Sequence, residues 1–276
     1  MKTLAARAGI AVLVVLFLSA ALAPFATPYG AEGRGTKSPA QLLSERHLPP
    51  SAAHPLGTDA HGRDLLARVL HGARVSLLMG IVARGLAILL GGAVGIAAGY
   101  LGGLADRILS RVMEIFLAFP GLLLAMAIGV ALGASTTTTL VAIVLVSWCD
   151  VAVILRAASA DLARRPFVVA ARAQGASETR IVALHLLPHL AGPAAVLFTF
   201  GIASAIMIES SLSFLGLAGG GGDLPTWGRM IFSEEPYLAI APWGVFAPGI
   251  FLAATVLGWN LVGDELRDRL DVRMDR

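Results

Sequence analysis

Four ionisable side chains lie within or beside long apolar runs of the sequence. They are Arg84, Glu114, Asp150 and Glu209. A charge in hydrocarbon is costly, so such residues usually face a partner or a water-filled cavity. By their positions along the runs, Arg84 and Glu209 fall in the outer half of a membrane, and Glu114 and Asp150 fall toward the cytoplasm. We interpret Arg84 and Glu209 as an intramembrane ion pair, with a place on a translocation path as the alternative.

The histidines have one spacing that could suit a metal. His185 and His189 stand four residues apart, but Pro188 interrupts that face and no acid joins them. His54 and its neighbours, His61 and His71, are scattered through one polar segment, which is more typical of a polar surface. The sequence therefore predicts no metal site.

The sequence lacks the residues that nucleotide binding and catalysis by a serine nucleophile require. The chain has no G-x-x-x-x-G-K-[ST] motif, and no helix with a lysine follows the run Gly219–Gly222. Ser147, Ser210 and Ser211 have no His and Asp partners at the same depth. We expect a chain that is not an enzyme and that binds no cofactor itself.

The composition indicates a membrane protein. The chain has 276 residues, a mean hydropathy of +0.78, and 14% charged residues, whereas soluble domains have about 25%. The net charge of +3 does not indicate a nucleic-acid partner. Cys149 is the sole cysteine and is interpreted as membrane packing.

The sequence contains six apolar runs that could cross a bilayer, which takes roughly 20 apolar residues as a helix. It shows no alternating strand pattern, so we predict an all-α polytopic membrane protein. Small residues such as Gly91, Gly95 and Gly99 suit close helix packing. The six runs are Ile10–Ala26, Leu77–Tyr100, Val112–Gly133, Leu140–Leu155, Pro193–Leu215 and Ile240–Val262.

Charge sets the orientation of these runs. Lys2 and Arg7 precede the first run, which could be a cleavable signal peptide, although we favour an uncleaved span because more spans follow. Most Lys and Arg residues fall in segments that are cytoplasmic if the amino terminus is inside. Both termini are then cytoplasmic, and segments Thr27–Ser76 and Ser213–Ala239 lie outside.

The first external segment divides in two. Thr27–Ala53 reads as irregular. His54–Leu77 places Leu65, Leu66, Val69 and Leu70 on one helical face, which predicts an amphipathic helix at the outer interface. We divide the chain into residues 1–76, with the first span and this loop, and a permeation core of residues 77–276.

Residues Arg164–Pro193 form the long polar break of the second half. Pro166 suits the first turn of a helix, Gly175 a left-handed terminator, and Ser177 the cap of a second helix. Ile181 and Leu184 are expected on one face, and Pro188 and Pro193 are expected to close the unit. Such a unit is either a loop on the membrane surface or a smooth knob for a groove on another protein.

This break resembles the cytoplasmic EAA loop of bacterial ABC importer permeases, although Val169 stands where that loop usually has a glutamate. The resemblance implies that the loop docks into an ATPase subunit and transmits its motion. It rests on the paired alanines, the glycine, the hydrophobic residue and Leu-Pro. The coupling residues implied are Ala170, Ala171, Arg172, Ala173, Gly175, Ala176, Ile181, Leu187 and Pro188.

Three further stretches resemble the dipeptide, oligopeptide and nickel subfamily, in its C-type permease subunit. They are His54–Leu77, Glu209–Met230 with its L-S-F-L-G-L…W-G pattern, and Asn260–Arg273. The resemblance implies a type I ABC importer permease fold in a bacterial inner membrane. It also implies a second homologous permease, two cytoplasmic ATPase subunits that hold ATP and Mg²⁺, and an external solute-binding protein.

On this reading the chain moves peptides, nickel or other small solutes by alternating access. An ion-gradient-driven secondary transporter is the alternative, but it favours inverted repeats, and none is visible. An intramembrane enzyme is disfavoured by the missing nucleophile and base.

Overall fold

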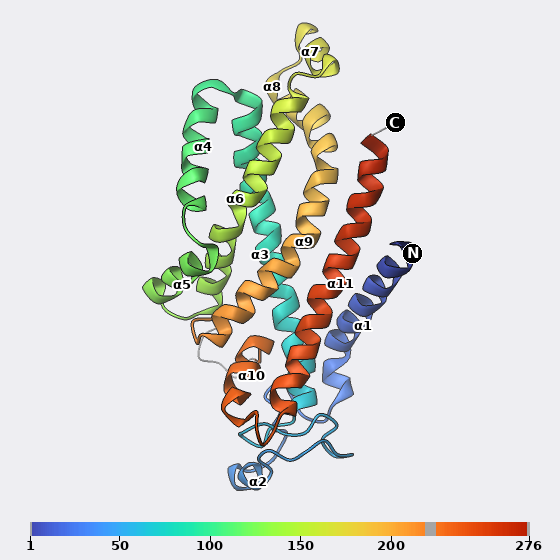
Figure 1. Ribbon diagram of the computed structural model, residues 1–276, viewed down its shortest axis with the longest axis vertical. Helices are drawn as coiled ribbons and strands as arrows, with labels where there is room; N and C mark the ends of the chain where they lie inside the picture. Colours follow the sequence, from blue (N-terminus) through green and yellow to red (C-terminus); the bar gives the residue numbers. More distant parts are fainter. Residues whose placement is uncertain (1, 219–224, 275–276) are drawn as a thin grey trace.

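Long apolar helices lie side by side along the longest dimension of the protein (Figure 1). The computed structural model describes residues 2–218 and 225–274, with side chains for residues 4–218 and 225–270. The predicted all-α class is confirmed. In chain order the elements are α1 (Lys2–Ala26), α2 (Pro39–Ser44), α3 (Leu65–Leu101), α4 (Gly103–Leu117), α5 (Gly121–Leu132), α6 (Thr136–Leu162), α7 (Pro166–Ala173), α8 (Glu178–Ile181), a π-helical turn (Val182–Leu186), α9 (Leu187–Phe214), α10 (Trp227–Glu234), a 3-10 turn (Glu235–Tyr237) and α11 (Trp243–Met274). The glycine run Gly219–Gly222 lies outside the described residues.

Five stretches of the described chain are long and apolar enough to span a membrane, or six if a bent pair counts as one span. The bent pair corrects the predicted run Val112–Gly133, because α4 ends at Leu117 and α5 leaves it at 84°. Pro120 supplies the reason: it lacks an N–H and keeps Phe119 out of the helical region.

The predicted amphipathic helix at the outer interface is also corrected. Residues 65–77 are the first turns of α3, which continues without a break to Leu101. Asp64 caps this helix, since its side chain accepts a hydrogen bond from Ala67 N at 2.7 Å. Leu65 and Val69 are buried in the core, and Arg68 is buried as well rather than lying at the surface. The boundary drawn at residue 76 falls inside α3.

The helix α6 is much longer than the predicted run Leu140–Leu155. It covers 27 residues, because the polar residues that shortened the prediction have partners on other helices. Asp150 pairs with Arg84, and Arg156 donates to Asp106 on α4 from Nε and Nη2.

The core is built where α3 packs against α6 and α9. A Cβ built on Gly91 would overlap the carbonyl oxygen of Trp148, and one on Gly95 would overlap that of Ala152. The predicted close packing of these glycines is therefore confirmed, because only a hydrogen side chain lets the two backbones meet. The neighbouring core of α3 and α9 includes Leu77, Ile202 and Ile206.

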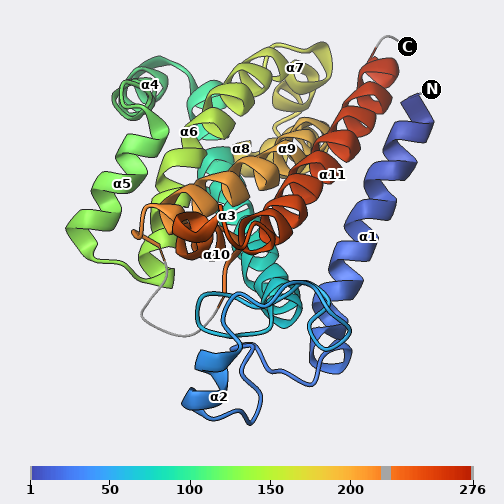
Figure 2. The same cartoon turned by 60° about the horizontal axis from the view of Figure 1, so that its bottom comes forward.

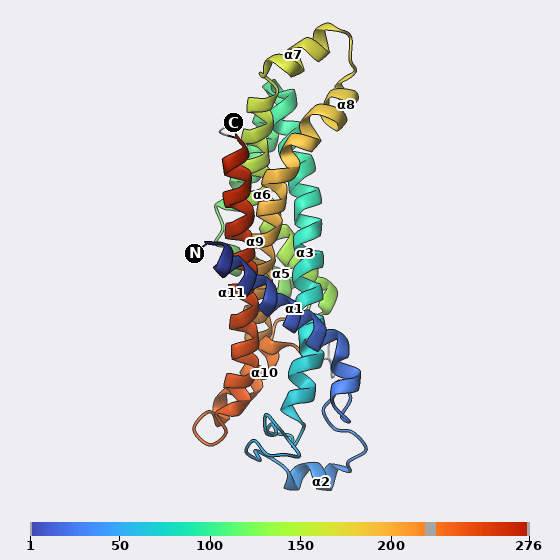
Figure 3. The same ribbon diagram turned by 90° about the vertical axis from the view of Figure 1, so that its right-hand side faces the viewer.

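One end of the bundle is covered by the segment 27–64 together with α10 (Figure 2). Trp243 Nε1 donates to the Thr58 carbonyl at 3.2 Å, and Ala60 N donates to the Glu234 carboxylate at 3.1 and 3.2 Å. The helices α7 and α8 lie at the opposite end (Figure 3).

Candidate functional site

The predicted coupling unit projects beyond the end of the bundle as two short helices (Figure 3). The first begins at Pro166, as predicted. Gly175 has φ +83°, the left-handed conformation that glycine adopts without strain. Ser177 then caps the second helix by accepting from Arg180 N at 3.4 Å. The turn that the sequence predicted at this glycine is therefore confirmed.

The second helix does not end where the prolines predicted. Pro188 lies in the first turn of α9 and Pro193 lies inside it, so neither closes the unit. A π-helical turn joins α8 to α9, and within it Leu187 N donates to Val182 O. The wider π-helical turn changes which side chains point toward the core. Ile181 and Leu186 are fully buried, while Leu184 is 59% exposed. The predicted shared face of Ile181 and Leu184 is wrong for this reason.

The small residues of the unit divide between two faces. Ala170, Ala173 and Gly175 are exposed, and the unpredicted Val169 joins them with 52% of its surface exposed. The other predicted residues split likewise: Arg172, Leu187 and Pro188 are exposed, and Ala171 and Ala176 are half-buried against the core around Ile181. The exposed surface of small side chains is thus centred on Ala170 and Ala173, and Ala171 packs beneath it.

His185 and His189 serve this unit structurally. His189 Nδ1 lies 2.7 Å from the His185 carbonyl oxygen, and its ring stacks on Phe167 at 5.0 Å between centroids. Phe167 belongs to α7, so the stack joins the first helix of the unit to α9.

A polar contact that the sequence did not predict fastens the unit to α3. The Tyr100 hydroxyl hydrogen-bonds the Glu178 carboxylate and accepts from Arg172 Nη2 at 3.0 Å. Arg172 also lies 3.5 Å from Glu178, with its guanidinium 5.4 Å from the Tyr100 ring centroid. The Tyr100 hydroxyl raises the pKa of Arg172, which therefore stays charged. The last turn of α3 thus touches both short helices.

An apolar cavity of about 760 Å³ opens beneath this contact. Its walls come from the last turns of α3, the π-helical turn and the start of α9, including Ile96, Val182 and Leu190. Glu178 stands at its rim. The cavity offers packing surface rather than catalytic groups.

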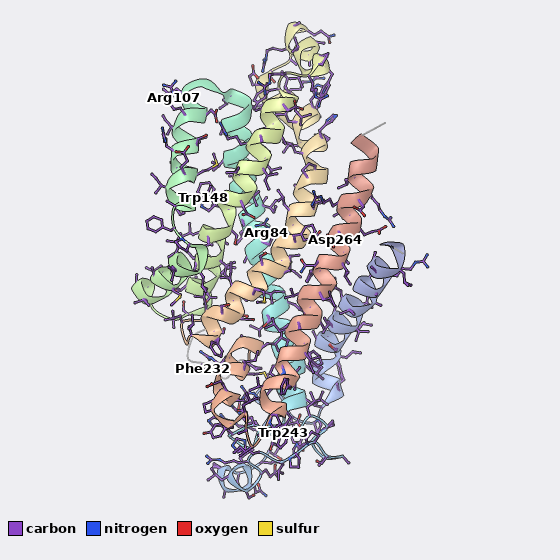
Figure 4. The ribbon with its side chains drawn as sticks, in the orientation of Figure 1. Arg84, Arg107, Trp148, Phe232, Trp243 and Asp264 are labelled. Carbon is purple, nitrogen blue, oxygen red and sulfur yellow. The ribbon has the colours of Figure 1, made fainter. Side chains whose placement is uncertain are left out.

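The intramembrane charges are arranged differently from the prediction. Arg84 binds Asp150, with Nη2–Oδ2 at 3.0 Å and Nη1–Oδ1 at 3.2 Å, and does not pair with Glu209. Arg84 and Asp150 therefore lie at one depth, at mid-height of the bundle (Figure 4), and the predicted separation into outer and cytoplasmic groups fails for them. Residues far apart in sequence meet here because α3 and α6 pack side by side.

Glu209 lies instead in a group of hydroxyls near α10. It accepts from Ser213 Oγ at 2.8 Å and Ser210 Oγ at 3.4 Å, and Thr226 donates to Ser213 at 3.1 Å. Glu114 is exposed on α4 and binds Arg111 at 2.6 Å. The hydrogen bonds from the serine hydroxyls explain how the buried carboxyl of Glu209 is tolerated in α9.

The chain matches a known protein family. The family described as binding-protein-dependent transport system inner membrane component matches residues 91–276. The chain belongs to this family. The match covers the long helices α6, α9 and α11 and the whole projecting unit, and it includes Asp150, whereas Arg84 lies before its first residue.

The relatives of this permease agree with that placement. It is 41% identical over 231 residues to the dipeptide transport system permease protein DppC of Alkalihalophilus pseudofirmus, covering 84% of this chain and 76% of the relative. It is 35% identical to the oligopeptide transport system permease protein OppC of Bacillus subtilis, covering 98% and 86%. A chain of the inward-facing MetNI methionine ABC transporter shares the fold, with a TM-score of 0.59, 19% identity, and coverage of 73% and 95%.

Proposed function

We propose that this permease moves peptides inward as part of an ATP-driven importer, handing each solute from an external binding protein to the cytoplasm. The observation that carries the substrate class is the similarity to dipeptide and oligopeptide permeases over most of the chain. The permease would work with a second homologous permease and two cytoplasmic ATPases that hold the ATP and Mg²⁺. Both termini would then be cytoplasmic.

In this proposal the projecting unit is the contact with an ATPase. Its support is geometric: the exposed part of α7 presents the small side chains of Ala170 and Ala173, and Arg172 is the one charged residue within this helix whose desolvation the contact would have to meet. Gly175 fixes the turn, and the buried Ile181 anchors the unit to the membrane helices. A rigid, anchored lever can pass a motion to the bundle because packed elements switch between discrete arrangements.

Reconstitution of the whole transporter tests this function. Proteoliposomes with both permeases, the ATPases and the binding protein should accumulate a labelled peptide only when ATP is supplied. Accumulation driven by a proton or sodium gradient without ATP would instead support the secondary transporter. Nickel offered with the binding protein separates the second solute class from peptides.

A further inference from the structure

Arg84 is the centre of a polar contact among three helices. Its side chain is buried, with 2% of the residue exposed. In addition to its bonds with Asp150, it donates to Ser147 O at 3.1 Å and to Leu197 O at 3.0 Å. Gly201 on α9 leaves the space for its guanidinium, because a Cβ there would overlap the Arg84 side chain. The positive charge is therefore enclosed by protein.

Asp150 is in the opposite position. Its side chain is 51% exposed, whereas that of Arg84 is 3% exposed. A carboxylate has about four lone-pair sites, and Arg84 occupies one on each oxygen. The outward side of the pair therefore presents negative charge at mid-height of the bundle.

A second polar feature lies beside Asp150 on the same side of α6. The backbone between α4 and α5 leaves the helix at Ala118–Pro120, and these residues are exposed. A Cβ on Gly121 would lie 2.8 Å from Val146, one turn before Asp150 on α6, so the break packs close to the acid. Lipid tolerates neither an open carboxylate nor irregular backbone, and both are found where a water-filled cavity or protein adjoins them.

We propose that Asp150 is a cation-binding subsite on the translocation path, with Arg84 as the buried residue that positions it. The group it takes is the ammonium of a passing peptide, such as a lysine side chain. An anion would meet the open carboxylate first, since Arg84 is enclosed. This inference rests on the proposed function, and it adds a charge preference that the permease itself imposes after the binding protein.

The first experiment compares two peptides of equal length in the reconstituted transporter, one with lysine and one with acetyl-lysine. Both are offered at saturating binding protein, after direct titration has shown that each is captured. Asp150→Asn should lower the ratio of lysine to acetyl-lysine uptake by about fivefold, as expected for one charge pair at 4 Å in water. Asp106→Asn, which alters another arginine-bound carboxylate between helices, should leave the ratio unchanged.

Asp150→Asn leaves Arg84 buried without its partner and can impair assembly. The double variant Arg84→Gln/Asp150→Asn removes both charges and keeps the test available. A lysine preference equal to that of the parent in the double variant overturns the proposal.

The second experiment needs no peptide. In a Cys149→Ser background, Ile154→Cys places a thiol one turn after Asp150, at a residue that is 46% exposed. A cationic, water-soluble thiol reagent should modify it about fivefold faster than an anionic one of similar size, and Asp150→Asn should remove that difference. No reaction with either reagent in any stage of the transport cycle would mean that Asp150 faces lipid or is covered by the second permease, and the proposal fails.

The two levels of inference fail separately. If the parent complex carries peptides with ATP while Asp150→Asn leaves both ratios unchanged, the proposed function stands and the subsite is rejected. If no peptide is carried by the parent, the function itself is at fault, and the thiol reaction still reports whether Asp150 faces water.

Discussion

At the scale of single residues, Gly201 shows how one missing side chain permits a charge inside the bundle. Arg84 occupies the space that a Cβ on Gly201 would fill, and its donors reach carbonyls on two other helices. An arginine in the membrane is thus tolerated because its N–H groups meet acceptors on α6 and α9 and Gly201 leaves room for it.

Gly201→Ala should therefore destabilise the permease. Overfilling a packed site costs about 1–3 kcal/mol, and here it also disturbs the Arg84 hydrogen bonds. Thermal unfolding in detergent should shift to lower temperature. Gly85→Ala is the matched control, because its Cβ would approach only Phe198, at 4.0 Å. Equal melting temperatures for the two variants would contradict the account.

Glu234 makes a pH-dependent contribution to stability at the end of the bundle that segment 27–64 covers. Burial raises the pKa of this carboxyl above its ordinary value of 4.5, and the hydrogen bond from Ala60 N offsets only part of the rise. The folded protein therefore holds the proton to higher pH than the unfolded chain does. The free energy of unfolding attributable to Glu234 falls as pH rises from 4.5 through the raised value.

Glu234→Gln should remove this loss. Melting temperatures measured from about pH 4 to about pH 8 cover both the ordinary pKa of a carboxyl and a raised one. The melting temperature of the variant should rise relative to that of the parent as pH rises. Glu235→Gln changes the neighbouring, exposed glutamate and should run parallel to the parent. If the melting temperature of Glu234→Gln instead falls relative to that of the parent as pH rises, Glu234 acts mainly as an ion.

At the scale of elements, the projecting unit combines an exposed face, which we propose docks on an ATPase, with a buried anchor. Ala173 is exposed on α7, whereas Ala171 is half-buried against the core of the unit. The same substitution at the two positions should therefore have different consequences.

Ala173→Glu should leave the permease folded and paired with its partner but reduce the ATP hydrolysis that loaded binding protein stimulates, because an unpaired charge enters the contact. Ala171→Glu should instead lower thermal stability, since it buries that charge within the unit. The measurements are melting temperature and stimulated ATP hydrolysis in the reconstituted complex. Unmodified transport by Ala173→Glu would reject α7 as the docking face.

The contact of Tyr100 with Arg172 and Glu178 links the end of α3 to both short helices. Tyr100→Phe keeps the ring in the core and removes only the hydroxyl. The hydroxyl makes two hydrogen bonds, one to Glu178 and one from Arg172. Each contributes about 0.5–1.5 kcal/mol, so stimulated ATP hydrolysis and uptake should fall together by about fivefold or more. If uptake is unchanged in Tyr100→Phe, with Arg172 and Glu178 both present, α3 does not receive the motion through this contact.

At the scale of the whole molecule, the arrangement of the two ends predicts the orientation. The segment 27–64 and α10 cover one end, and α7 and α8 extend from the other (Figures 1 and 3). If α7 meets a cytoplasmic ATPase, the first end must be external.

Single cysteines test this orientation in a Cys149→Ser background, which removes the sole native cysteine. Ser51→Cys, exposed at the covered end, should react with an impermeant reagent added to intact cells. Gln174→Cys, exposed on the projecting unit, should react only after permeabilisation. The reverse pattern would invert the topology.

The sequence by itself determined the all-α class, most of the membrane runs in outline and the turn at Gly175. These depend on local properties: apolar length, helix-ending residues and the φ angle that glycine allows. The same local rules failed at Pro188 and Pro193, because Pro188 is accommodated in the first turn of α9 and Pro193 lies inside that helix.

Only the tertiary structure decided which charges meet. Arg84 could have paired with any acid in the membrane, and its position along α3 favoured Glu209. The packing of α3 on α6 through Gly91 and Gly95 brings Asp150 to it instead. Pairing at this distance in sequence depends on helix crossing and register, which no single run encodes, and the half-open face of Asp150 follows from the same packing.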